Sequence, residues 1–236
     1  MKKLFVFLVF IIFSKEMFSS HDIGLQGAVK VAEETYLFKG NDNKLKFYDN
    51  KGDFYLIITI NKEDKDKSSI TFVDNLKKYY VSVTKREINS IATLKNLFSP
   101  KSKKDKNYQI KEKGKNKEIL NFEFKEYFSS SEIGEIDLFF SKEMDAYLRK
   151  FITYDDFINF LKDTDLSSIP FIDSYFELIK YFINQSLELG FIGEIYLNRE
   201  NLYSISSLKE SIITNKEFEI PKNYEKKGIE SFLGDF

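Results

Sequence analysis

Few residues in this chain have the chemistry that a catalytic site needs. His21 is the only histidine, it lies beside a candidate signal-cleavage region, and the chain contains no cysteine. These counts exclude Ser-His-Asp and Cys-His nucleophilic catalysis, zinc sites built on histidine, and redox chemistry at cysteine. The glycine-rich motifs that bind phosphate, GxxxxGK[ST] and GxGxxG, are also absent from the sequence. Carboxylates are therefore the remaining candidates.

One carboxylate pair lies on a predicted strand. Glu135 and Asp137 are two residues apart, so their side chains share one face of the strand and could act as an acid and a base. They alternate with Ile136 and Leu138, however, which is the pattern of a strand with one solvated and one buried face. We interpret them as a solvated face.

A second group consists of four aspartates, Asp155, Asp156, Asp163 and Asp165. Their number suggests a calcium loop, but the glycine and the terminal glutamate of such a loop are missing. Helix ends and turns explain these residues better. The sequence thus predicts no catalytic residue, no metal site and no cofactor, and it favours a protein that is not an enzyme.

Lysine is concentrated in residues 101–117, which could contact anionic lipid or nucleic acid. Acidic residues are interspersed in this stretch, Tyr108 is its only aromatic residue, and the whole chain has a net charge of −1. We interpret the stretch as a solvated loop with a turn at Gly114. Contact with lipid headgroups is the best functional alternative, and no nucleic-acid partner is predicted.

The N-terminus has the features of a targeting segment. Lys2 and Lys3 precede ten apolar residues, 4–13, which as a helix would span about 15 Å, half of a bilayer core. We predict a signal peptide over 1–20, a single domain over 21–236, and a periplasmic or secreted location. The small residues near the end of the segment form no Ala-x-Ala site, so an uncleaved anchor or a buried N-terminal strand remains open.

Alternating apolar and polar residues predict strands in most of the remaining chain. Hairpins are expected from 44–48 with 53–60, from 69–73 with 78–83, and from 119–127 with 133–140. Residues 26–38 are expected to form one strand. Residues 190–224 are expected to be a closing run of antiparallel strands that ends at 218–224, with Phe218 and Ile220 pointing inward.

Helical spacing of apolar residues predicts helices over 85–98, 144–161 and 170–189, with Thr153 as an N-cap that restarts the middle one. The last helix is apolar around more than half of its circumference, so it is either a lid over a ligand cavity or a plain core helix. Phenylalanine and tyrosine contribute 17% of the residues, which predicts an aromatic core. The fold class is α+β with an antiparallel sheet.

Three segments together resemble a known group of proteins: residues 218–224 (FEIPKNY), residues 72–80 (FVDNLKKYY) and the paired strands at 119–140. Their order resembles that of uncharacterised bacterial exported proteins with a domain of unknown function. Those proteins look like relatives of the periplasmic lipoprotein carriers of the outer-membrane localisation pathway. The chain departs from the pattern where Asn121 and Phe139 replace an expected glycine and tryptophan, and its helical insert at 144–188 is longer.

The resemblance implies a curved antiparallel sheet, a half-barrel, wrapped around helices, with an apolar interior that in the carriers accepts acyl chains. We expect a non-enzymatic binding protein for a lipid or a lipoprotein acyl chain. Its interior would be lined by aromatic and aliphatic residues, namely Phe139, Tyr175, Phe176, Ile179, Phe182 and Phe191. The alternative is an envelope module with a closed core that binds other envelope proteins, and a hydrolase is a third, weaker reading.

Overall fold

The structure, a computed structural model, describes residues 23–98, 109–131, 134–149, 154–165 and 176–229. The predicted signal peptide and Thr153 lie outside these ranges. Twelve strands form one open sheet in the order β12-β6-β5-β4-β3-β2-β1-β11-β10-β9-β8-β7. All neighbouring pairs are antiparallel except β12 with β6. The large antiparallel sheet that the sequence predicts is thus confirmed.

The first half of the sheet is a meander of six strands, each paired with the next along the chain. They are β1 (Ile23–Val31), β2 (Glu34–Asn41), β3 (Lys44–Asp49), β4 (Phe54–Thr59), β5 (Ser69–Asp74) and β6 (Tyr79–Thr84). The turn between β3 and β4 uses Gly52 at φ +68, a conformation that glycine adopts without strain. The two predicted hairpins in this region are confirmed.

The second half of the sheet returns to β1 through the long strand β11. Its strands are β7 (Ile110–Ile119), β8 (Phe122–Ser131), β9 (Gly134–Ser141), β10 (Phe191–Leu197) and β11 (Glu200–Ile212). Strand β11 pairs with β1 along its length, which joins the two halves.

Two of the predicted strand boundaries are wrong. Residues 26–38 span two strands that turn at Ala32, which has a φ of +52 although it is not a glycine. Gly114 lies within β7 at an irregularity in its pairing with β8, and the hairpin turn is instead at Leu120 and Asn121, both with positive φ. No glycine occupies these two turns, so the sequence does not indicate them. Their positions follow from the long pairing of the flanking strands.

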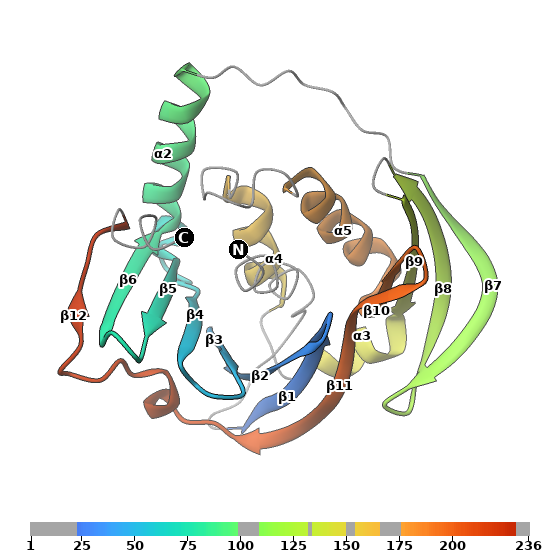
Figure 1. Ribbon diagram of the computed structural model, residues 1–236, viewed down its shortest axis with the longest axis horizontal. Helices are drawn as coiled ribbons and strands as arrows, with labels where there is room; N and C mark the ends of the chain where they lie inside the picture. The colour runs from blue at the N-terminus through green and yellow to red at the C-terminus, as the bar shows by residue number, and fades with distance from the viewer. Residues whose placement is uncertain (1–22, 99–108, 132–133, 150–153, 166–175, 230–236) are drawn as a thin grey trace.

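The described helices are α2 (Lys85–Phe98), α3 (Lys142–Leu148), α4 (Tyr154–Asp163) and α5 (Phe176–Leu189). Ser141 caps α3 by accepting a hydrogen bond from the backbone N–H of Met144 at 3.0 Å. The sheet curves around α4 and α5, while α2 projects from the end of β6 (Figure 1). Among the described residues, no helix is both long and apolar enough to span a bilayer.

The face of the sheet that curves around α4 and α5 is concave, and the other face is convex. The C-terminal segment 213–224 covers the convex face of β3–β6. Phe218 ends a short 3-10 helix, η3 (Asn215–Phe218), and is buried with Ile213 against Tyr55, Ile57 and Val73. The prediction that Phe218 and Ile220 alternate inward on a strand is therefore wrong. Only Glu225–Lys226 pairs in this region, as β12. The segment acts as a strap over a second, smaller core.

Candidate ligand-binding face

The concave face of the sheet carries a continuous apolar surface. Alternate residues of each strand point to it, and the antiparallel register places Phe47 beside Leu56, which in turn lies beside Phe72. In the other half of the sheet, Leu138 lies beside Ile195 and Ile195 beside Tyr203. These side chains belong to one buried cluster that extends across the sheet from β6 to β8.

Two helices cover this surface within the curve of the sheet. Helix α4 contributes Phe157, Phe160 and Leu161 to the cluster, and α5 contributes Phe182. Each of these four side chains is at most 5% exposed. Burial of such side chains is the main term that holds helix and sheet together.

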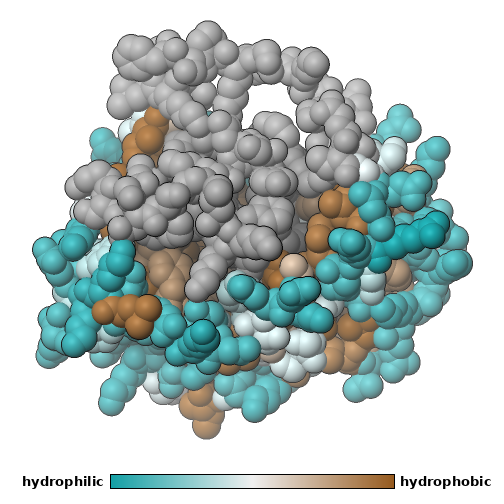
Figure 2. All heavy atoms as spheres, in the orientation of Figure 1, coloured by the Kyte–Doolittle hydropathy of each residue, from teal (hydrophilic) through white to brown (hydrophobic). Residues whose placement is uncertain are grey.

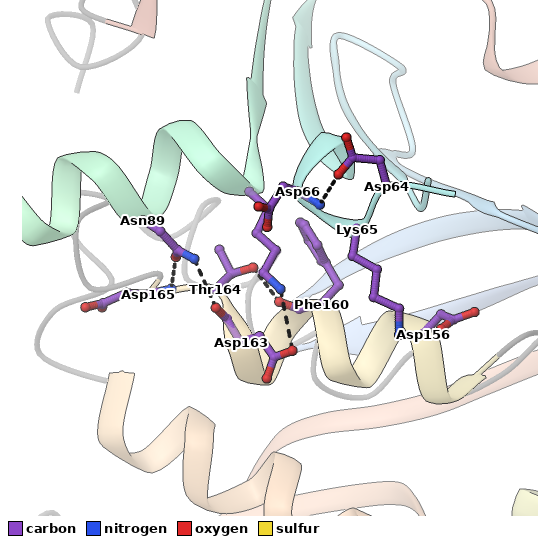
Figure 3. Close-up of polar contacts among 10 residues, drawn as sticks. Asp64, Lys65, Asp66, Asn89, Asp156, Phe160, Asp163, Thr164 and Asp165 are labelled. Atoms are coloured by element: carbon purple, nitrogen blue, oxygen red, sulfur yellow. Dashed lines mark hydrogen bonds and ion pairs between the residues drawn. The ribbon is translucent and has the colours of Figure 1, made fainter. Parts of the chain in front are cut away.

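The end of α4 is attached to α2 by polar contacts, of which the side chain of Asn89 makes two, as Figure 3 shows. The Asn89 side-chain nitrogen donates to the backbone carbonyl of Asp163 at 3.2 Å, and its oxygen accepts from the backbone N–H of Asp165 at 2.8 Å. A carbonyl in the last turn of a helix has no partner within the helix, so Asn89 supplies one. We call this arrangement the Asn89 clamp.

Two lysines, one in α2 and one in a short 3-10 helix, add ion pairs to the docking of α4. Lys85 Nζ lies 3.5 Å from the Asp163 carboxylate, at the C-terminal end of α4 where the helix dipole favours a cation. Lys65, in the 3-10 helix η1 (Lys65–Lys67), lies 3.4 Å from the Asp156 carboxylate. Asp156 and Asp163, two of the aspartates that the sequence interpretation assigned to helix ends and turns, thus serve to dock α4. The described residues contain no cluster of three or more histidine, cysteine, aspartate or glutamate side chains that could hold a metal ion.

Asn89→Ala should loosen α4 locally. The substitution leaves the Asp163 carbonyl and the Asp165 N–H without their partner, at a cost of about 1 to 3 kcal/mol. Amide hydrogen exchange should accelerate in α4 while exchange in β3 and β4 stays unchanged. Ser90→Ala is the matched control, because Ser90 bonds only to Arg86 of its own helix. Unchanged exchange in α4 would contradict the docking role of Asn89.

The predicted lining residues fall into three groups. Phe182 and Phe191 are buried in the main cluster, at 5% and 3% exposure. Phe176 and Ile179 lie on α5, whose side chains at these positions are not described, and Tyr175 lies outside the described residues. The prediction for Phe139 is wrong, because Leu138 and Phe140 point to the concave face and Phe139 points away from it.

Phe139 instead belongs to a network on the convex face that the sequence interpretation missed. Its ring lies 5.9 Å from that of Tyr196, and Lys117 Nζ lies 5.4 Å from the Phe139 ring centre. Lys117 also pairs with Glu194 at 2.6 Å. Lys117 is thus held by a carboxylate and an aromatic face together.

Asp137 belongs to the same convex network. Lys113 Nζ lies 2.6 Å from Asp137 and 3.0 Å from Glu126, and these hydrogen bonds raise the pKa of Lys113. Asp137 therefore has a structural ion pair on the sheet surface, while its neighbour Glu135 is exposed. This agrees with the interpretation of the pair as a solvated face.

Two cavities lie near the β7–β8 end of the sheet, with volumes of about 330 and 420 Å³. The larger cavity is lined by polar residues alone, namely Asn116, Lys117, Glu118, Asn121, Glu123 and Glu143. The smaller combines charged residues with Tyr127, Phe140 and Leu189. Elsewhere the visible surface is mostly hydrophilic, with separate small hydrophobic patches (Figure 2).

A scan against family models finds no match, and a search of the curated proteins finds none either. Among solved structures, PNGF-II in the P21 space group is similar to this chain with a TM-score of 0.42 and 9% identity. The similarity covers 91% of this chain and 33% of that one. PNGF-II in the C2 space group has a TM-score of 0.41, with 11% identity over 91% and 32%. The chain thus spans about a third of the PNGF-II chain, and no function is carried over from it.

Proposed function

We propose that this chain is an exported, non-enzymatic binding protein that shelters an apolar ligand between its curved sheet and its helices. The ligand class is a lipid or the acyl chain of a lipoprotein, as in the periplasmic lipoprotein carriers that the sequence resembles. In this proposal the protein is α+β, a half-barrel around α4 and α5, and it acts in the periplasm or outside the cell.

One observation carries the proposal. The concave face is apolar from β6 to β8 and its cover is two short helices. Of these, α4 is attached to α2 through the polar contacts of Asn89 and Lys85, and to η1 through Lys65. Polar contacts exchange with water at little net cost, whereas an apolar sheet face needs an apolar partner. An acyl chain that displaces α4 would make apolar contacts with the concave face in place of those that the helix loses.

Uptake of an environment-sensitive fluorescent fatty acid tests the proposal. A reversible cross-link that holds α4 in place tests whether the ligand enters by displacing α4. The chain has no cysteine, so Lys65→Cys with Asp156→Cys introduces one unique pair for a short, reducible bifunctional thiol reagent. We expect uptake by the unlocked protein, loss of uptake on cross-linking, and recovery after reduction.

Lys39→Cys with Glu217→Cys is the matched control pair, because these residues form a 2.9 Å ion pair that ties the C-terminal strap to the convex face. Cross-linking this pair should leave uptake unchanged. Absence of uptake by the unlocked protein would overturn the proposal. Full uptake with the Lys65–Asp156 pair locked would overturn displacement of α4 as the route.

The second candidate is an envelope module with a closed core that binds other proteins. The close packing of the cover favours it, since Phe157, Phe160 and Leu161 are at most 4% exposed and already fill the concave side at α4. In that case, fatty-acid uptake is absent and pull-down from envelope extracts retains partner proteins that the convex face binds.

A further inference from the structure

The 330 Å³ cavity lies where the concave face meets β7 and the end of α5. Its apolar floor consists of Tyr127, Phe140 and Leu189. The Tyr127 and Phe140 rings meet edge to face at 5.4 Å, and both residues belong to the main buried cluster. The floor of the cavity is therefore continuous with the apolar surface on which the proposed ligand would lie.

The rim of the cavity is charged and slightly acidic. Glu112 and Lys125 pair with each other at 3.2 Å, so their charges cancel. The other charged residues of the rim are one lysine, Lys142, and two glutamates, Glu123 and Glu143. These two glutamates are held together, because Glu143 accepts a hydrogen bond from the backbone N–H of Glu123 at 3.1 Å.

Two helix ends meet at this rim. Helix α5 ends at Leu189, where the last carbonyls carry a partial negative charge, and α3 begins at Lys142, where the first N–H groups carry a partial positive charge, so the two dipoles offset each other. The carboxylates of Glu123 and Glu143 therefore provide the attraction for a cation, and Lys142 provides a positive charge for an anion beside them.

We infer that this cavity binds the ammonium-bearing headgroup of an amphiphile whose acyl chain enters the apolar interior. The inference rests on the proposed function and names its substrate class, a zwitterionic lipid with an amine and a phosphate. Glu123 and Glu143 bind the ammonium group, Lys142 contacts the phosphate, and the acyl chain leaves the cavity over Tyr127 and Phe140. The same rim disfavours a headgroup that carries only negative charge.

The test compares two lysophospholipids with the same acyl chain, one with an ethanolamine and one with a glycerol headgroup, each below its critical micelle concentration. With the full chain, we expect the ethanolamine lipid to bind about tenfold more tightly, the effect of one charge-assisted hydrogen bond. In Glu123→Gln with Glu143→Gln this ratio should fall to about one, and affinity for the glycerol lipid should not decrease.

Glu135→Gln is the matched control, because Glu135 is an exposed acid at the other end of β9 and does not line the cavity. It should keep the full ratio. Equal binding of the two lipids to the unsubstituted protein would overturn the headgroup assignment and leave the proposed function standing. Binding of neither lipid would overturn the proposed function itself.

Discussion

Replacing Phe47 with alanine is expected to lower the free energy of unfolding by about 3 to 5 kcal/mol. Phe47 is fully buried on β3, and its ring lies 6.4 Å from that of Phe38 on the neighbouring strand. Its removal leaves a cavity at the centre of the concave face, and the lost transfer free energy and the lost packing add together. Urea unfolding monitored by circular dichroism measures the change.

Leu76→Ala is the control, because Leu76 is 73% exposed and its removal creates no cavity. The control should unfold within about 0.5 kcal/mol of the unsubstituted protein. A Phe47→Ala protein with the stability of the control would show that the concave face is not the tightly packed core described above.

Phe218→Ala should lower the free energy of unfolding by about 3 kcal/mol, because it disrupts the smaller core on the convex face. Phe218 is 6% exposed and joins the C-terminal strap to Tyr55 and Val73 on the convex face, with Lys44 Nζ 6.0 Å from its ring centre. Without this ring the strap loses its main apolar anchor, so the melting temperature should fall and amide exchange in β4 should accelerate.

Glu219→Ala provides the comparison, since Glu219 is the exposed residue that follows Phe218. It removes a side chain from the strap but no buried area, so its melting temperature should be unaltered. An unaltered melting temperature in Phe218→Ala as well would mean that the strap does not stabilise the sheet.

Local sequence signals predicted those parts of the fold that local chemistry determines. Gly52 lies in a turn between two alternating segments, and the hairpin there formed as expected. The apolar spacing at 85–98 predicted the bounds of α2. Ala32 and Leu120 have positive φ without a favourable residue type, so only the pairing of the long strands places these turns.

Alternation predicts that a strand has two faces, but it does not say which face becomes concave. Phe139 and Phe218 are aromatic residues that were expected inside, yet the structure places both on the convex side. Burial occurs on both sides of this sheet, because the strap covers one and the helices cover the other. The relevant contacts are between residues far apart in the chain, which the sequence does not display.

The contacts of the candidate site, too, join residues that are far apart in the chain and could not be predicted from the sequence. Asn89 reads as a solvated residue of an amphipathic helix, and its partners Asp163 and Asp165 follow more than 70 positions later, at separations of 74 and 76. Glu123 and Glu143 form the rim of one cavity although they come from β8 and α3. The sequence could predict a thin catalytic inventory and an aromatic core, but not which polar side chains meet.

Native mass spectrometry of the full chain, extracted mildly from the cell envelope, tests the central claim most directly. If the curved sheet shelters an apolar ligand, the spectrum should contain a species heavier than the protein by the mass of a lipid, and its collisional release should yield that lipid. A spectrum with only the ligand-free mass, together with no uptake of labelled lipid by the same preparation, would contradict the claim.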